Sequence, residues 1–378
     1  MKLLIIDHNA LDPLHRALYD ALSRYDDMQI RLLVPSRWFD NYQWLTWNEG
    51  RHQCSYEIFP CDIIMPSRTH RMMYRSIPHH LKSFGPDIIY MNAEPENFQT
   101  VHIRFLVRKY PRMKFVFSSW RNIDHAETGY PYKLGFLHAL AERIVLRRAD
   151  HCIAFNKAAS DIFSKNGFLS VTVIPPSIDV NYFREGSERG QHREHTHQFT
   201  IGYIGRFIVE KGIDTLLQAA SSLPFAYNLR FIGDGPAKEQ WRRLAERLNI
   251  AKNISWIPPV SHPEIINHFK DIDVIVLPSR TGAQWKEQFG RVLIEAMACE
   301  VPVIGSDSGE IPNVIGDAGL IFREEDARQL SGLLQRVHDE RPLRELLAER
   351  GLARVRQHYS TDVVAPLYYD LFRQLNTP

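Results

Sequence analysis

The residues best suited to chemistry lie between positions 205 and 312, in four segments that each follow a short apolar run. The first reads Gly205-Arg206-Phe207-Ile208-Val209-Glu210-Lys211-Gly212. A glycine lets the backbone approach a ligand closely, and Arg206 and Lys211 can converge on one anion beside the helix expected from about Ile213. The segment is therefore either a diphosphate clamp or a surface loop with two solvated cations.

Two carboxylates flank a predicted helix start in the segment Glu287-Gln288-Phe289-Gly290-Arg291-Val292-Leu293-Ile294-Glu295. Gly290 indicates that the helix begins near it, which leaves Glu287 in the loop and Glu295 on the helix. The two carboxylates can accept hydrogen bonds from two sets of sugar hydroxyls, and the backbone amides of Phe289 to Val292 can face phosphate oxygens. The alternative is a capped helix with Glu295 in a surface ion pair.

The other two segments are short loops between a strand and a helix. Gly233-Asp234-Gly235-Pro236 is typical of a tight turn, and Gly305 to Pro312 either borders the same site or uses Ser306 and Asp307 to cap a helix. Asp271-Ile272-Asp273 imitates a metal-binding motif but leads directly into an apolar strand. We interpret it as a turn before that strand, so no divalent metal is required.

Short apolar runs alternate with helix-period segments along both halves of the chain, which predicts an α/β protein with two doubly wound, Rossmann-like domains. In such folds ligands bind beyond the carboxyl ends of the strands, so the main site is expected in a cleft between the domains. The predicted strands are Leu3 to Ile6, Ile30 to Val34, Ile88 to Tyr90, Lys114 to Phe117, Val171 to Ile174, Phe199 to Ile204, Asn228 to Ile232, Ile254 to Ile257, Val274 to Leu277, Val303 to Ile304 and Leu320 to Phe322.

A polar run without apolar residues, positions 185–198, predicts the linker between the two domains. The domains then span residues 1–184 and 199–359, and the final segment, 360–378, is expected to pack back onto the first. The linker histidines His192, His195 and His197 lie among flexible polar residues, so we interpret them as solvated rather than as metal ligands.

Composition excludes several classes of protein. The chain has 378 residues, enough for two or three domains. Its 46 Lys and Arg against 44 Asp and Glu give a net charge of +2, which is too little to drive nucleic-acid binding.

Four cysteines without C-x-x-C spacing suit a reducing compartment. No apolar stretch approaches the roughly 20 residues that span a bilayer, and the N-terminal apolar run is too short for a signal peptide. We expect a cytoplasmic protein.

Taken together, these segments resemble the retaining nucleotide-sugar glycosyltransferases of family 4, which have the GT-B fold of two Rossmann-like domains. The similar motifs are GRF-x3-KG at 205–212, GDGP at 233–236, LPS at 277–279, E-x7-E from Glu287 to Glu295 and PVIGSDSGEIP at 302–312. They occur in the family's order and approximate spacing, and looser matches in the first half extend the resemblance over nearly the whole chain.

The resemblance implies roles for individual residues. Arg206 and Lys211 would hold the diphosphate of a UDP- or GDP-sugar donor, Glu295 the ribose, and Glu287 with Phe289 and Gly290 the transferred sugar. Glu287, Arg206 and Lys211 would then be the catalytic residues. The donor-binding set would be Gly205, Arg206, Lys211, Gly233, Phe289, Gly290, Arg291, Val292 and Glu295. Family members generally need neither metal nor cofactor, and retention follows front-face attack by the acceptor without a protein nucleophile.

The acceptor side departs from the family pattern. Asp7-His8-Asn9 stands where many members have a glycine-rich loop, and Ser119-Trp120-Arg121-Asn122 stands where many have a histidine. Trp120 either stacks on a sugar or is a buried structural residue, and nearby His125 could replace the missing histidine. The candidate acceptor-side residues are Asn9, Glu94, Trp120, Asn122 and His125.

Two basic runs, 68–82 and 104–114, contain interleaved apolar residues and are either solvated helix faces or contacts with an anionic membrane surface. The sequence thus predicts a metal-independent retaining glycosyltransferase that moves a sugar from a nucleoside diphosphate donor to a hydroxyl of a glycan, lipid-linked saccharide or small molecule. A sugar-nucleotide epimerase of the same fold and a non-catalytic sugar-nucleotide-binding protein are the alternatives.

Overall fold

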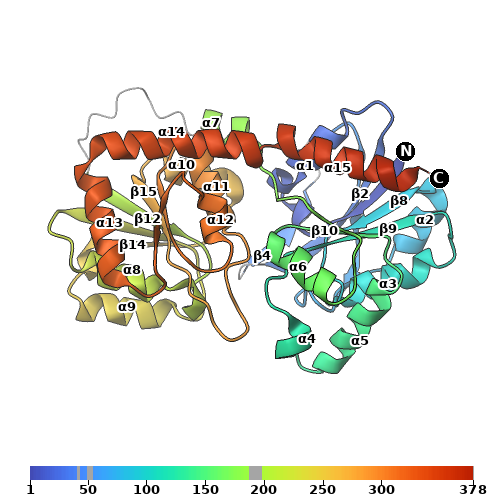
Figure 1. Ribbon diagram of the computed structural model, residues 1–378, viewed down its shortest axis with the longest axis horizontal. Coiled ribbons are helices and arrows are strands. Elements are labelled where there is room, and N and C mark those ends of the chain that lie inside the picture. The colour runs from blue at the N-terminus through green and yellow to red at the C-terminus, as the bar shows by residue number, and fades with distance from the viewer. Residues whose placement is uncertain (41–42, 49–53, 187–197, 378) are drawn as a thin grey trace. The chain divides into compact units, whose positions relative to one another are not determined.

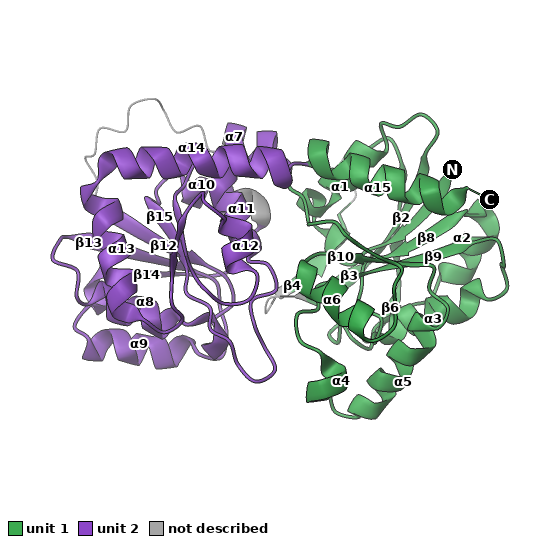
Figure 2. Ribbon diagram, in the orientation of Figure 1, with its two compact units in different colours: residues 1–178, 361–378 green, residues 179–360 purple. Residues whose placement is uncertain are grey.

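A computed structural model describes residues 1–40, 43–48, 54–186 and 198–377 of the chain. The contacts divide it into two compact units, Met1–Ile178 with Thr361–Pro378 and Asp179–Ser360 (Figures 1 and 2). Most of the predicted linker, including His192, His195 and His197, lies outside the described residues.

The first unit is built on a seven-stranded parallel sheet in the order β11-β10-β9-β8-β1-β2-β5, with helices packed around it. Its central strands are fully buried because they are apolar on both faces, as in Leu3 to Ile6. The strands of this sheet are β1 (Lys2–Ile6), β2 (Gln29–Pro35), β5 (Glu57–Cys61), β8 (Ile88–Met91), β9 (Lys114–Ser119), β10 (His151–Ala154) and β11 (Val171–Val173). Two small hairpins are β3 (Arg37–Asp40) with β4 (Gln43–Thr46) and β6 (Ile63–Ile64) with β7 (Met73–Tyr74). The helices are η1 (Asn9–Leu11), η2 (Pro13–Arg16), α1 (Ala17–Leu22), α2 (Ile77–Phe84), α3 (Phe98–Val107), α4 (His125–Thr128), α5 (Gly135–Leu146), α6 (Lys157–Lys165) and α15 (Thr361–Asn376).

The second unit has a six-stranded parallel sheet in the order β14-β13-β12-β15-β16-β17. Its strands are β12 (Phe199–Ile204), β13 (Tyr227–Ile232), β14 (Ile254–Ile257), β15 (Val274–Leu277), β16 (Val303–Ser306) and β17 (Leu320–Phe322). Its helices are α7 (Val180–Gly186), η4 (Val209–Lys211), α8 (Ile213–Ala220), α9 (Lys238–Arg247), η5 (Ala251–Asn253), α10 (His262–Phe269), α11 (Arg291–Ala298), α12 (Ile311–Ile315), α13 (Ala327–Asp339) and α14 (Arg341–His358). Both units are therefore Rossmann-like, as predicted.

Every predicted strand of the second half is present, whereas the sheet of the first half holds two strands that are not among the predicted ones: the inner strand β10, whose four residues begin with a histidine, and the edge strand β5. Its segment Glu57–Cys61 contains a glutamate and a proline, and it lies at the edge of the sheet, where one side needs no partner strand. An edge strand does not need the continuous apolar run by which central strands are recognised.

The boundary between the units lies at Ile178, earlier than the predicted 184. Helix α7 belongs to the second unit because Phe183 is buried and its backbone carbonyl accepts a hydrogen bond from the Cys299 thiol at 3.5 Å. The C-terminal helix α15 returns to the first unit, where Tyr369 stacks on Tyr25 with ring centroids 3.7 Å apart.

Candidate functional site

The centre of the candidate site in the second unit is the buried carboxylate of Glu287. Its Oε2 lies 2.5 Å from the Lys211 Nζ and accepts a hydrogen bond of 2.6 Å from the Ser279 hydroxyl. Burial favours the neutral acid, but Lys211, Ser279 and the charge of Arg206 outweigh it and hold the pKa of Glu287 below its ordinary value. Glu287 is therefore an ionised acceptor of hydrogen bonds near neutral pH.

The backbone around Glu287 is fixed by two neighbouring strand ends. Ser279 follows β15, and its carbonyl accepts a hydrogen bond of 2.5 Å from the Ser306 hydroxyl at the end of β16. The carbonyl of Glu287 accepts a bond of 3.1 Å from the Glu310 amide. Gly309 has a φ of +54°, and a Cβ there would lie 2.1 Å from this carbonyl oxygen. The loop from Gly305 to Pro312 thus borders the site, and Ser306 binds Ser279 instead of capping a helix.

Lys211 reaches Glu287 from the loop after β12. Gly212, which follows it, has a φ of +63°, and a Cβ at this position would lie 2.0 Å from the carbonyl oxygen of Pro278. The loop therefore packs directly on the residue before Ser279, which sets the Lys211 side chain beside the carboxylate. Its Nζ also lies 5.3 Å from the ring centroid of Trp285, within cation–π range.

Arg206 differs from Lys211 in having a free guanidinium. Its side chain is exposed and forms no hydrogen bond or ion pair with another described residue, while its carbonyl accepts a bond of 2.8 Å from the Tyr203 hydroxyl. The structure thus brings both predicted cations near Glu287, which Arg206 reaches electrostatically. Lys211 is engaged by the carboxylate, so Arg206 is the cation more available to an incoming anion.

The turn at Gly233 packs against the predicted segment 205–212. The Gly205 amide donates a hydrogen bond of 3.0 Å to the Ile232 carbonyl, and the Phe207 amide donates one of 2.8 Å to the Asp234 carbonyl. A Cβ at Gly233, whose φ is +144°, would lie 2.0 Å from the Gly205 carbonyl oxygen. The close approach of the two loops therefore requires glycine at position 233.

Helix α11 begins at Arg291 after Gly290, which has a left-handed backbone conformation, as the sequence predicts. Glu295 lies on this helix and is buried, with its Oε1 3.1 Å from the Arg291 Nε. The ion pair of the alternative interpretation therefore exists, but the Glu295 carboxylate in it is buried and not at the surface. The Phe289 ring is buried against Tyr359, with centroids 5.6 Å apart, so only the backbone of Phe289 is suited to contact a ligand.

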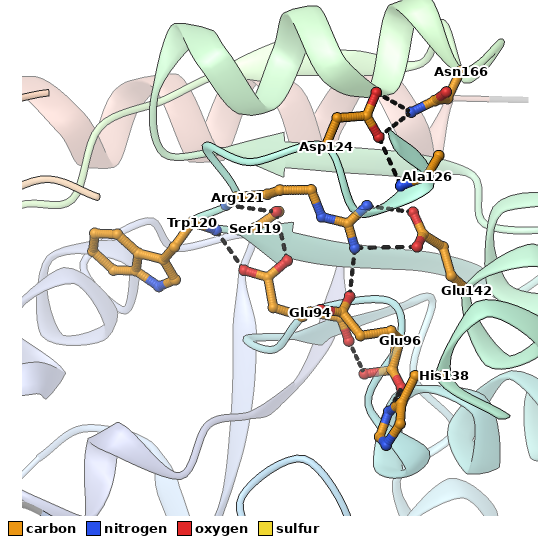
Figure 3. A network of polar contacts seen from close by, with 11 residues as sticks. Glu94, Glu96, Ser119, Trp120, Arg121, Asp124, Ala126, His138, Glu142 and Asn166 are labelled. Carbon is orange, nitrogen blue, oxygen red and sulfur yellow. Dashed lines mark hydrogen bonds and ion pairs between the residues drawn. The ribbon is translucent and has the colours of Figure 1, made fainter. Parts of the chain in front are cut away.

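A buried charged network holds the strand ends of the first unit (Figure 3). Arg121 after β9 forms ion pairs with Glu96 at 2.6 Å and with Glu142 on α5 at 2.5 Å. The Glu96 carbonyl lies 3.0 Å from the Nδ1 of His138, which is fully buried. Two carboxylates therefore share one arginine, and the network ties the loop after β8, the loop after β9 and α5 together.

Glu94 lies beside this network and is partly exposed. Its carboxylate accepts hydrogen bonds of 2.6 Å from the Trp120 amide and from the Ser119 hydroxyl. Burial and the neighbouring Glu96 carboxylate raise the pKa of Glu94 to about 8, although Arg121 and the two hydrogen bonds oppose the shift. Glu94 is thus a carboxyl group that changes protonation near neutral pH.

The other acceptor-side candidates are placed as follows. The Trp120 ring is half-buried against Phe155, with centroids 4.2 Å apart, and the Trp120 amide meets Glu94. Asn122 is buried, and His125 begins the short helix α4. Asn9 lies in a 3-10 turn after β1, where its amide donates to Asp7 at 2.9 Å. The structure thus joins Glu94 to Trp120, while no hydrogen bond between Asn9 and these residues is observed in the described part of the chain.

Two contributors to the sites escaped the residue-by-residue sequence analysis. Ser279 was noted only within the LPS motif, and its position directly after a buried strand is the signal that could have identified it. Arg121 was noted only within a motif, because its partners Glu96 and Glu142 are distant in sequence.

Among the described residues, no group of three or more His, Cys, Asp or Glu side chains is arranged to hold a metal ion. Asp273 lies directly before β15 and accepts a hydrogen bond of 2.8 Å from the backbone amide of Thr200 on β12, as expected of a turn before a strand. No helix within the described ranges is both long enough and apolar enough to cross a membrane.

Comparison with known proteins shows two levels of similarity. Residues 185–354 match the family described as Glycosyl transferases group 1. The D-inositol 3-phosphate glycosyltransferase of Mycolicibacterium smegmatis is 28% identical over 220 residues, which cover 54% of this chain and 49% of that protein. The enzyme of the same name from Mycobacterium tuberculosis (strain ATCC 25177 / H37Ra) is 29% identical over 194 residues, which cover 48% of this chain and 39% of that protein. The chain therefore spans half or less of the length of these relatives.

Solved structures resemble the whole chain. Sucrose-phosphate synthase from Thermosynechococcus elongatus aligns over 99% of both chains with a TM-score of 0.75 and 18% identity. Anabaena Alr3699/HepE in complex with UDP-glucose aligns over 99% of this chain and 100% of its own, with a TM-score of 0.73 and 16% identity. At these identities the similarity establishes the fold, which is GT-B with two Rossmann-like domains.

Proposed function

Because residues 185–354 match the family described as Glycosyl transferases group 1, we propose that the chain is a retaining glycosyltransferase that uses a nucleoside diphosphate sugar, UDP- or GDP-linked, as its donor. The acceptor is a hydroxyl of a glycan, a lipid-linked saccharide or a small molecule. The reaction needs neither metal nor cofactor, and the protein works in the cytoplasm, in part at the inner face of the membrane.

The observation that carries the proposal is the pairing of Lys211 with the buried Glu287 beside the guanidinium of Arg206, which has no side-chain partner among the residues that the structure describes. As the sugar departs, negative charge accumulates on the diphosphate. Arg206 is suited to neutralise it, because a guanidinium binds phosphate oxygens in a bidentate manner. The N-terminal amides of α11 add a favourable dipole. A preorganised positive environment of this kind substitutes for a divalent cation.

Glu287 holds the transferred sugar in this proposal. Its lowered pKa keeps it ionised, and one oxygen, Oε2, is engaged by Lys211 and Ser279. A carboxylate has two oxygens with several acceptor positions, so it can also receive hydrogen bonds from sugar hydroxyls. The acceptor hydroxyl attacks the face that the diphosphate leaves, so the anomeric configuration is retained.

Two substitutions test this assignment. Arg206→Ala is expected to lower turnover about 10²-fold or more, because it removes a charge that stabilises the transition state. Glu287→Ala is expected to impair transfer while leaving nucleotide binding mostly intact. Arg243→Ala, in an exposed position on α9, is the matched control and should behave like the original chain. Near-normal turnover of Arg206→Ala would contradict the clamp, and loss of nucleotide binding in Glu287→Ala would contradict the division of roles.

The same assays separate the proposed transferase from its alternatives. A transferase releases nucleoside diphosphate at a rate that depends on the acceptor. An epimerase would convert the donor without any acceptor, and a binding protein would retain the donor unchanged.

A further inference from the structure

Helix α5 carries an exposed stripe that is apolar at one end and cationic at the other. Phe136, Leu140, Arg143 and Arg147 are all exposed, the first two at 68% and 52%. At 3.6 residues per turn their positions fall within about 60° of one another around the helix. The fully buried His138 and Val145 lie on the opposite side. The stripe is therefore the solvent-facing surface of the helix.

Helix α3 packs against α5 (Figure 1). It carries exposed apolar and cationic side chains of the same kind. Phe105 is 53% exposed, and Arg108 and Lys109 follow it at the end of the helix. Just before α5, Leu134 is 56% exposed and has a φ of +64°, an uncommon conformation for a leucine. We call the surface formed by these side chains the α3–α5 surface; it comprises Phe105, Leu134, Phe136, Leu140, Arg108, Lys109, Arg112, Lys133, Arg143, Arg147 and Arg148.

The charge of this region is strongly one-sided. Residues 98–149 contain ten Lys and Arg against three Asp and Glu, a net charge of +7, whereas the whole chain has +2. All three acidic residues are occupied, because Glu142 pairs with the buried Arg121 and both Asp124 and Glu127 pair with Lys165. Within the described ranges, no cation of the α3–α5 surface forms a hydrogen bond or ion pair through its side chain. The surface therefore lacks internal neutralisation.

Helix stability explains only part of this pattern. Cations at the ends of α3 and α5 interact favourably with the helix dipoles, which accounts for Arg108, Lys109, Arg147 and Arg148. The dipoles do not account for large apolar side chains that point into water in the middle of the same surface. Apolar residues surrounded by unpaired cations are the pattern of a protein segment that lies on an anionic lipid surface.

We propose that the α3–α5 surface docks the chain onto anionic lipid bilayers, with Phe105, Leu134, Phe136 and Leu140 entering the interface and the surrounding cations contacting lipid headgroups. This inference deepens the proposed function by naming the surface and the lipid charge through which the chain meets the membrane, and it does not require transferase activity. A nucleic acid duplex would also attract the cations, but its phosphates offer nothing to the exposed apolar side chains, which a lipid interface accepts, so we favour the lipid surface.

Vesicle co-sedimentation of the full chain, without any sugar nucleotide, tests the proposal. Vesicles of phosphatidylcholine alone are compared with vesicles that also contain phosphatidylglycerol. We expect binding to the anionic vesicles only. Arg143→Gln with Arg147→Gln should weaken it about 30-fold, which corresponds to about 1 kcal/mol for each cation near the surface. Phe136→Ser with Leu140→Ser should weaken it at least about tenfold, because less apolar area enters the interface.

Two matched controls distinguish this surface from general charge or exposure. Arg243→Gln with Arg247→Gln removes two exposed cations at the same spacing on α9, and Val363→Ser with Leu367→Ser removes two exposed apolar residues at the same spacing on α15. Both pairs should bind vesicles as the original chain does, and unchanged melting temperatures should show that all four variants fold.

Three results would overturn the proposal. The first is absence of binding to anionic vesicles, and the second is equal loss of binding in the α9 control pair. The third is binding to a DNA duplex that Arg143→Gln with Arg147→Gln abolishes while vesicle binding is unchanged, which would identify a nucleic-acid surface instead. Transfer activity enters none of these measurements, so failure of the transferase proposal would be seen separately.

Discussion

The buried ion pair between Lys211 and Glu287 allows a quantitative prediction for Lys211→Met, which keeps most of the side chain's apolar stem and removes the charge. The two side chains are only 12% and 8% exposed, and Nζ lies 2.5 Å from Oε2. Removing one partner of a buried pair leaves an uncompensated charge and costs about 3 to 5 kcal/mol. Because the Ser279 hydroxyl still binds Glu287, we expect the lower end, about 3 kcal/mol, in the free energy of unfolding of the second unit at pH 7.

The same substitution should change the pH dependence of stability. In the original chain the pKa of Glu287 is lowered despite burial. Ionised Glu287 therefore contributes to the free energy of unfolding above pH 4.5, its pKa in the unfolded chain, and this contribution is lost as the pH falls through its lower pKa in the folded chain. Without Lys211, burial dominates and raises the pKa of Glu287, so the variant relieves its penalty by binding a proton. The stability difference between the two chains should therefore shrink as the pH falls from the raised pKa of Glu287 in the variant, above 4.5, through its lowered pKa in the original chain.

Urea denaturation measures both effects, and Lys238→Met is the matched control. Lys238 pairs with the more exposed Asp234 at 3.5 Å, so its loss should cost less than about 1 kcal/mol. In a double-mutant cycle, Lys211→Met and Glu287→Gln should show a coupling energy of at least about 2 kcal/mol. Additive effects, or equal costs at positions 211 and 238, would refute the reasoning.

Three further predictions concern neighbouring contacts. Gly309→Ala should destabilise the second unit and weaken donor binding, because a Cβ would lie 2.1 Å from the Glu287 carbonyl oxygen; unchanged melting temperature and nucleotide affinity would contradict this. Ser306→Ala should cost about 1 to 2 kcal/mol in urea denaturation, since it removes a buried hydrogen bond to Ser279, and a neutral effect would count against that bond. Because the pKa of Glu94 is raised to about 8, the original chain should lose stability as the pH rises from about 4.5 to about 8, whereas the Glu94→Gln variant should not. The melting temperature of the variant should therefore rise relative to that of the original chain over this pH range. A difference in melting temperature that does not depend on pH would refute the shift.

The sequence was most informative where local patterns determine structure. Parallel strands buried on both faces are continuous apolar runs, so all six strands of the second unit could be predicted. Gly290 marked the start of α11 because a left-handed conformation favours glycine. Since Arg206, Lys211 and Glu287 each follow such a strand, the topology that gathers strand ends also brought these residues together.

Contacts between distant residues could not be predicted in this way. The sequence proposed that Lys211 and Arg206 share one anion, but it did not indicate that Lys211 pairs with Glu287, 76 positions later. The high pKa of Glu94 depends on Glu96, Arg121 and burial, which only the folded unit brings together. Likewise, helical spacing cannot tell which apolar residues of α5 are exposed, and the exposure of Phe136 emerged only from the structure.

The central claim, that the cluster around Arg206 binds a nucleoside diphosphate, is tested most directly by thermal shift. UDP, GDP, ADP and CMP are each added with and without EDTA, because a ligand that binds only the native state raises the melting temperature. The account predicts a shift with one nucleoside diphosphate that persists in EDTA and disappears in Arg206→Ala. A shift with none of the nucleotides, or one that EDTA abolishes, would contradict it.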